Sequence, residues 1–254
     1  MPAPINTLKA ALAAGDLQQG LWVGFGSDAV AEQCAAAGYD WCLIDGEHGP
    51  NDIPRFESQL RAMAAHDTSV VVRVPQGDDW LIKMVVDLGA QTVVVPMVNT
   101  AQQAERVARA MRYPPHGHRG MGASLGRASM YSHDPEYLSN ANEEMCCIIQ
   151  AETMEALENL EDICAVEGVD GVFIGPADLS ADMGHTGNSS HPDVIAAIER
   201  AVVTIRAAGK AAGMLEFRPP QAKVWASKGV TFLAVGSDVT LLKGALTQLK
   251  SALE

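Results

Sequence analysis

The sequence predicts an α/β fold of the (β/α)8 TIM-barrel class, on three observations. Eight short apolar segments alternate along the chain with segments of helical periodicity. The apolar segments are continuous runs, which are typical of parallel strands buried on both faces. The length of 254 residues suits one such barrel. We therefore expect a single domain over residues 1–254.

The expected strands are rich in β-branched and other large apolar residues, which favour a sheet. In chain order they are residues 20–27, 41–44, 69–74, 92–98, 147–149, 171–174, 211–217 and 231–236. The expected helices repeat apolar residues at three- and four-residue spacing, and Gly38, Gly89 and Gly209 each end one of them. They are residues 7–14, 28–37, 53–65, 80–88, 101–111, 135–142, 153–166, 193–208, 220–228 and 238–253.

Two stretches bear on the choice of fold. A doubly wound open sheet is the alternative, and a glycine-rich phosphate loop after the first strand would favour it. Gly24-Phe25-Gly26 is the only candidate, and the third glycine of that motif is missing. Residues 113–132 are rich in Gly, Pro, His and Arg and fit no period, which is typical of a functional or mobile segment.

Charge and composition exclude several classes of partner. The net charge of −13 argues against nucleic acid or an anionic membrane as the main partner. No apolar run approaches the roughly 20 residues of a membrane span, and no secretory signal is recognisable. The five cysteines form no CxxC pair and lie mostly in apolar runs. We expect buried free thiols and a cytoplasmic protein.

Two carboxylates follow neighbouring expected strands. The strand at 147–149 leads into Gln150 and Glu152, and the strand at 171–174 leads into Asp178. With the helix between them, these strands form a parallel βαβ unit, so Glu152 and Asp178 should lie side by side at one end of the sheet. There they would bind a hard cation or act as an acid–base pair. The alternative is that each caps the helix that follows it.

Other polar residues are expected at the same ends of the strands, where barrel active sites lie. Arg73 interrupts a run of valines and would suit an enolate or carboxylate oxygen, or else a structural salt bridge to a nearby acid. His48 follows Asp45 and Glu47 in a turn flanked by glycines. It would serve as a general base or be a solvated loop residue.

The remaining lysines and histidines limit the chemistry. No lysine lies at the C-terminal end of an expected strand, so a Schiff-base mechanism has no evident nucleophile and enolate chemistry would depend on a metal. The histidines in or beside residues 113–132 lack the ligand spacing of a zinc site; they are His116, His118 and His133. The others are expected on the surface or in loops; they are His66, His185 and His191.

Several stretches together resemble the HpcH/HpaI family of metal-dependent, class II pyruvate aldolases. The resemblance covers nearly the whole chain, and we see no departure at the catalytic positions. The matching stretches are WCLIDGEHG (41–49), VVRVP (71–75), VVPM (94–97), RYPPHGHRGMG (112–122), IIQAE (148–152) and GVFIGPADLS (171–180).

The resemblance implies a role for each site residue. Glu152 and Asp178 would bind a divalent cation, Mg²⁺, Mn²⁺ or Co²⁺, that pyruvate chelates. Arg73 would stabilise the enolate, and His48, through a bound water, would take the proton from the C4 hydroxyl. Asp87, from the same or a neighbouring subunit, would raise the basicity of His48, with Asp45 as the second candidate. The implied substrate-binding residues are Trp22, Gln150, Gly175, Pro176, Ala177, Asp178 and Leu215.

The resemblance also implies an activity and an assembly. The activity is reversible aldol cleavage of a 4-hydroxy-2-oxo acid, of the 4-hydroxy-2-oxoheptanedioate or 2-keto-3-deoxy sugar acid type, to pyruvate and an aldehyde. The assembly is a homohexamer, a trimer of dimers, with the C-terminal helix at 238–253 exchanged between subunits.

Two other functions compete with the aldolase. One is phosphoenolpyruvate mutase or phosphotransferase chemistry on a related barrel, but no phosphate-binding nest is found near the seventh or eighth strand. The other is a non-catalytic assembly subunit with a relic metal site, and the retained His48, Arg73, Glu152 and Asp178 count against it.

Overall fold

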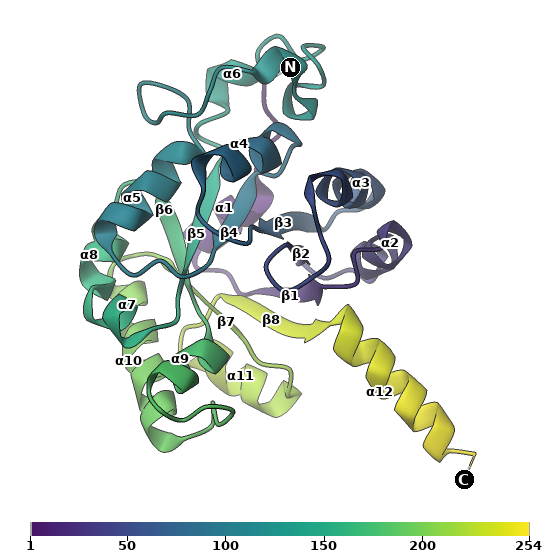
Figure 1. Cartoon of the computed structure of the whole chain (residues 1–254), viewed down its shortest axis with the longest axis vertical. Coiled ribbons are helices and arrows are strands. Elements are labelled where there is room, and N and C mark those ends of the chain that lie inside the picture. Colours follow the sequence, from purple (N-terminus) through teal and green to yellow (C-terminus); the bar gives the residue numbers. More distant parts are fainter. Residues whose placement is uncertain (1, 254) are drawn as a thin grey trace.

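A computed structural model describes residues 2–253, and its centre is a closed barrel of eight parallel strands (Figure 1). Each strand pairs with the next along the chain, and β8 pairs with β1. Closure confirms the (β/α)8 prediction and excludes the doubly wound open sheet. The strands are β1 (Gln18–Val23), β2 (Trp41–Asp45), β3 (Ser69–Arg73), β4 (Thr92–Val95), β5 (Cys146–Ala151), β6 (Val169–Ile174), β7 (Ala211–Leu215) and β8 (Phe232–Ser237).

Helices surround the barrel (Figure 1). They are α1 (Thr7–Ala14), α2 (Asp28–Ala36), α3 (Ile53–Met63), α4 (Asp79–Asp87), α5 (Ala101–Ala110), α6 (Tyr137–Asn140), α7 (Met154–Glu158), α8 (Leu160–Ala165), α9 (Pro176–Asp182), α10 (Pro192–Ala207), α11 (Pro219–Ser227) and α12 (Asp238–Ser251). The helix expected at 153–166 is divided at Asn159 into α7 and α8, and α9 was not expected. The segment at 113–132 contains two short 3-10 turns, η1 (Ala123–Leu125) and η2 (Arg127–Ser129).

The inside of the barrel is filled by large aromatic side chains. The rings of Trp41 and Phe232 stack with centroids 4.1 Å apart, and Trp22 and Phe173 pack beside them. A Cβ on Gly20 would lie 2.0 Å from the Trp41 ring, so the strand leaves room for the indole only without a side chain there. Leucines of α1 extend this cluster. The inner cluster makes the barrel a packed core rather than a pore.

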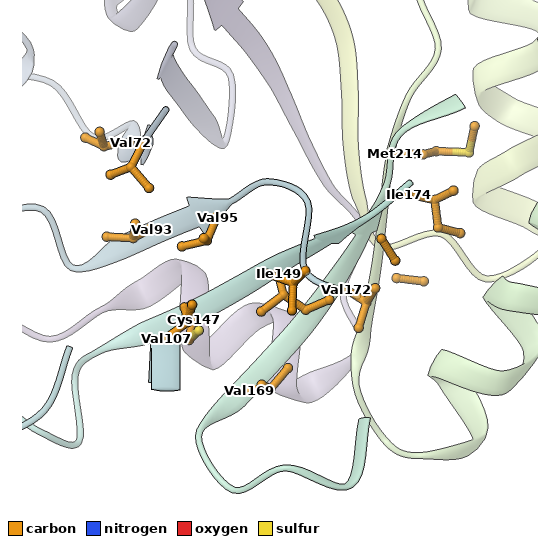
Figure 2. Close-up of a cluster of buried hydrophobic side chains, with 14 of the residues drawn as sticks. Val72, Val93, Val95, Val107, Cys147, Ile149, Val169, Val172, Ile174 and Met214 are labelled. Atoms are coloured by element: carbon orange, nitrogen blue, oxygen red, sulfur yellow. The ribbon is translucent and has the colours of Figure 1, made fainter. Parts of the chain in front are cut away.

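A second apolar layer lies between the strands and the outer helices (Figure 2). Neighbouring residues of one strand divide between the two layers: Ile148 belongs to the inner cluster and Ile149 to the outer one. This division follows from the two-residue period of a strand, and it explains why the strands read as continuous apolar runs. Figure 2 shows Val72, Val95 and Val172 among the outer side chains.

All five cysteines are buried and unpaired, as the sequence predicted. Within residues 2–253, no helix combines the length and the apolar character needed to cross a membrane. The last helix, α12, projects away from the barrel (Figure 1). It carries exposed leucines that belong to neither of the two core clusters: Leu241, Leu242, Leu246 and Leu249.

Candidate active site

The C-terminal ends of β2, β3 and β5 bring buried polar side chains to one rim of the barrel. Asp45 and Arg73 are the last residues of adjacent strands and are register partners. Gln150 lies near the end of β5, and Glu152 follows it directly. All four are at least nine-tenths buried, whereas Asp178, in the first turn of α9, is exposed. Burying a polar group without a hydrogen-bond or ionic partner is energetically costly. The partners of these four side chains therefore define the site.

Arg73 is the centre of the network. Its Nε and Nη2 donate to the two carboxylate oxygens of Asp45, each at 2.8 Å. Its Nη1 lies 2.7 Å from Glu47 Oε2 and 3.5 Å from Gln150 Oε1, while the guanidinium carbon sits 5.0 Å from the centre of the Trp22 ring. Asp45 therefore holds one edge of the guanidinium as a bidentate fork, while Nη1 reaches both Glu47 and Gln150.

Asp45 organises the turn that carries His48. Besides Arg73, its Oδ1 accepts hydrogen bonds from the backbone N–H groups of Glu47, at 3.0 Å, and His48, at 3.4 Å. Burial raises the pKa of Asp45, but the hydrogen bonds and charge of Arg73 outweigh it and hold that pKa below its ordinary value. Gly46 is required in this turn, because a Cβ there would lie 2.7 Å from the Arg73 carbonyl oxygen.

The turn presents His48 to solvent. Its imidazole is exposed, and Nε2 lies 3.9 Å from Glu47 Oε2. No hydrogen bond joins the imidazole to Asp45 among the described residues, since Asp45 contacts only the backbone of His48. A base at this place would reach substrate from the open side of the barrel.

Two neutral hydrogen-bond donors hold the Glu152 carboxylate, which forms no salt bridge with a basic side chain of the described residues. Its Oε1 accepts the backbone N–H of Met97 at 2.9 Å, and its Oε2 accepts Gln150 Nε2. Burial raises the pKa of Glu152, and the negative charges of Asp178 and Glu47 raise it further, against the effect of the two hydrogen bonds. Neither bond is to the helix that follows, where Thr153 caps α7 instead. The helix-capping alternative therefore fails for Glu152.

The acids of this rim fit a hard divalent cation. Glu152 and Asp178 supply oxygen donors, and their mutual repulsion is what a bound cation would relieve. Gly175 makes room for the Glu152 carboxylate: a Cβ there would lie 2.3 Å from Glu152 Oε2. Two protein carboxylates leave most of an octahedral shell for substrate and water, as Mg²⁺ and Mn²⁺ sites require.

The expected substrate-binding residues other than Gln150 and Asp178 lie at the start of α9 and around the inner aromatic cluster. Gly175 and Pro176 are buried at the start of α9 beside Glu152, and Ala177 is exposed. Trp22 lies beneath Arg73, and Leu215 ends β7 and packs against the inner cluster.

Asp87 lies away from the rim within the subunit. It ends α4, which runs back from the rim toward the start of β4. There the Nη2 of buried Arg119 donates to its carboxylate at 2.5 Å. Arg119 in turn stacks over Tyr113 at 4.3 Å, so Asp87 anchors the irregular segment at 113–132.

Sequence reasoning missed the contribution of Glu47. It was recognised only as a polar residue near a strand end, whereas the structure places it against Arg73 and within electrostatic reach of Glu152. A second missed contact is that of Asp238, whose carboxylate accepts the backbone N–H groups of Gly24 and Phe25 and so ties the end of β1 to α12.

Comparison with known proteins is consistent with this geometry. Residues 18–245 match the family described as HpcH/HpaI aldolase/citrate lyase. The chain is 51% identical over 242 residues to a hydroxypyruvate/pyruvate aldolase of Roseovarius nubinhibens, covering 95% of this chain and 94% of that protein. It is 52% identical over 244 residues to a 4-hydroxy-2-oxo-heptane-1,7-dioate aldolase of Shigella sonnei, covering 96% and 93%. A crystal structure of an HpcH/HpaI aldolase/citrate lyase family protein from Burkholderia cenocepacia superposes with a TM-score of 0.95 at 38% identity, over 98% of this chain and 99% of that one.

Proposed function

The chain belongs to the HpcH/HpaI aldolase/citrate lyase family, and we propose that it is a carbon–carbon lyase that cleaves 4-hydroxy-2-oxo acids reversibly to pyruvate and an aldehyde. The observation that carries this proposal is the pairing of Arg73 with buried Asp45 and partly buried Glu47 on the same rim as Glu152 and Asp178. Positive charge beside candidate cation ligands is what an enolate-forming site requires. No lysine follows the C-terminal end of any strand among residues 2–253, so a Schiff base is not available.

Each rim residue has a role in this reaction. Glu152 and Asp178 would hold a divalent cation, Mg²⁺, Mn²⁺ or Co²⁺, whose Lewis acidity would polarise the 2-oxo group of the substrate. Gln150 and the backbone at 175–177 border the pyruvate half. Arg73, fixed by Asp45, keeps positive charge beside the oxygen on which negative charge develops.

His48 acts on the other half of the substrate. Its exposed imidazole, through a water molecule, takes the proton from the C4 hydroxyl as the C3–C4 bond breaks and the aldehyde leaves. The electron pair of that bond passes into the enolate, and protonation at C3 then gives pyruvate. In the condensation direction the same proton returns to the new hydroxyl.

The aldehyde is not specified by these groups, because all but His48 act on the pyruvate half. Relatives of nearly equal identity are named for different substrates, hydroxypyruvate or pyruvate in one case and 4-hydroxy-2-oxo-heptane-1,7-dioate in the other. We propose that the acceptor is a small aldehyde. The candidates to test in the condensation direction are succinic semialdehyde, tartronate semialdehyde and lactaldehyde, with pyruvate or hydroxypyruvate as the donor.

The experiment is a pyruvate-release assay over a panel of 4-hydroxy-2-oxo acids. It is run with EDTA and after addition of Mg²⁺, Mn²⁺ or Co²⁺. We expect turnover only with a divalent cation, and full activity after complete chelation would refute the metal mechanism. A parallel assay for phosphate release or transfer from phosphoenolpyruvate should be negative, and turnover there would replace the aldolase by the phosphoenolpyruvate alternative.

The projecting helix α12 supports the proposed homohexamer, a trimer of dimers with this helix exchanged between subunits. Its exposed leucines would be covered by a second copy. Sedimentation analysis of the wild type and of Leu242→Glu, at an exposed position of α12, tests this: a smaller species is expected for the variant, and a monomeric wild type would refute the assembly. The buried free thiols support the proposed cytoplasmic location.

A further inference from the structure

The loop between α9 and α10 gathers two histidines and an acid that the aldolase reaction does not use. Among residues 2–253, His185, His191 and Asp193 are the one set of three His, Cys, Asp or Glu side chains whose ligand atoms all lie within 4.8 Å of one another. The two imidazole rings stack with centroids 3.5 Å apart and planes 13° from parallel. The sequence alone indicated two unrelated loop residues, so the cluster is a product of the fold.

The distances in this cluster suit a bridging cation. His185 Nε2 lies 3.8 Å from Asp193 Oδ2, and His191 Nδ1 lies 3.7 Å from the same oxygen. Zinc binds imidazole nitrogen and carboxylate oxygen at about 2.0–2.2 Å, so two such bonds at the tetrahedral angle span roughly 3.3–3.6 Å, slightly less than the separations observed here. The lone pair of a ring nitrogen lies in the ring plane, so binding by all three atoms requires one imidazole to rotate out of the stack and turn its nitrogen toward the ion.

The backbone holds both histidines in place. The N–H of His185 donates to the Ser180 carbonyl of α9 at 2.7 Å, and the N–H of His191 donates to the Asn188 carbonyl at 3.0 Å. His191 is the N-cap of α10, and its Nδ1 accepts the N–H of Asp193 in a long bond of 3.3 Å. Because that bond is weak, the nitrogen is available to a stronger acceptor of its lone pair.

The donors also fix the class of metal. Two imidazoles and one carboxylate favour a borderline transition metal such as Zn²⁺ over Mg²⁺, which prefers oxygen. The imidazoles are about one-third exposed or less, and the Asp193 side chain is 72% exposed, so a cation could enter and keep a water as its fourth ligand. The cluster follows α9, whereas Asp178 lies in its first turn.

We propose that His185, His191 and Asp193 form a second metal site, separate from the catalytic acids, that binds one Zn²⁺ and ties the end of α9 to the start of α10. Because Zn²⁺ would bind this site only in the folded chain, it would also stabilise the folded state. The site does not depend on the aldolase assignment, because none of its three ligands is among the residues assigned to that reaction.

The test removes the catalytic ligands first. In Glu152→Gln/Asp178→Asn, prepared free of metal, a Zn²⁺ titration against a chromophoric chelator should still show one equivalent bound. Adding His185→Phe, which keeps a stacked ring, or His191→Asn, which keeps a capping side chain, should weaken that binding by more than the roughly 10–100-fold lost when a group outside the ligand set is removed. His133→Ala, the loss of an exposed histidine elsewhere, should leave it unchanged.

Two further measurements keep the proposal falsifiable if the doubly substituted protein is poorly folded. The first uses single variants that keep Glu152 and Asp178, with saturating Mg²⁺ present. Under these conditions His185→Phe should bind one Zn²⁺ fewer than His133→Ala. Cu²⁺ bound to wild type under the same conditions should show hyperfine coupling to two nitrogens by electron paramagnetic resonance, and to one in His185→Phe. Equal Zn²⁺ binding by His185→Phe and His133→Ala, or unchanged coupling, would overturn the proposal.

Discussion

Gly175→Ala is the sharpest single test of the rim geometry. Gly175 has an ordinary extended backbone, with φ −91° and ψ 96°, so alanine adopts it without strain. The added methyl group would lie 2.3 Å from Glu152 Oε2 and 2.9 Å from Glu152 Cβ. Any effect of the substitution therefore comes from contact with this carboxylate rather than from the backbone.

The size of the effect follows from the distance. Non-bonded atoms settle near 3.5 Å, so the methyl group and the carboxylate oxygen must move apart by roughly 1 Å. Glu152 is tied to the Met97 N–H and to Gln150, and a shift of that size breaks at least one of these bonds. Because a 1 Å misplacement of catalytic groups can reduce a rate by about 10²-fold, we expect kcat/KM to fall by about that factor. The midpoint of activation by Mg²⁺ or Mn²⁺ should rise with it.

The assay is the initial rate of pyruvate release as a function of metal concentration. The matched control is Gly120→Ala, where a new Cβ would meet only the Lys83 side chain at an ordinary 3.6 Å. Circular dichroism and a thermal melt establish that both variants are folded. A folded Gly175→Ala protein with the kcat and metal midpoint of Gly120→Ala would refute the assignment of Glu152 as a metal ligand.

Three further predictions concern the same chain. Arg73→Ala should lower kcat by about 10²–10³-fold, the usual cost of losing a group that stabilises an oxyanion, and near-normal kcat in a folded variant would contradict its role. His48→Ala should slow aldol cleavage more than exchange of the pyruvate methyl protons, measured by NMR in D₂O, because the base acts on the C4 hydroxyl; equal losses would reassign it. Burial raises the pKa of the Cys42 and Cys164 thiols to about 11, so thiolate is scarce near pH 8 and a disulfide reagent should react with them only after unfolding; rapid reaction of the native protein would contradict their burial.

The strands were predictable because each is a continuous apolar run, whereas their ends were not. β1 begins at Gln18, earlier than expected, because Gln18 and Gln19 pair with β8 through backbone groups that their side chains do not reveal. α9 spans 7 residues, which is shorter than the window in which helical periodicity is recognisable. Proline at its first turn and Asp178 two residues later were the available signals.

The site was predictable to the level of which residues share the rim, because strand ends in a parallel barrel meet there. The direction of each side chain was not, since it depends on turns and on contacts distant in sequence. Glu47 turns toward Arg73 because Asp45 accepts two backbone N–H groups of the same turn. The stacking of His185 on His191 likewise depends on how the loop between α9 and α10 closes.

The choice of a carboxylate to assist His48 shows how sequence proximity can mislead. Asp45 is three residues away, but its register partner is Arg73, and both of its oxygens are used by the guanidinium while one also holds the turn. Its lowered pKa reflects that commitment and leaves it acting on His48 only through the backbone. Asp87 ends α4 at the opposite end of the barrel and is bound by Arg119. Within one subunit it is too remote to orient the imidazole, so assistance by Asp87 requires the neighbouring subunit of the proposed assembly, and the aldolase activity would then depend on oligomerisation.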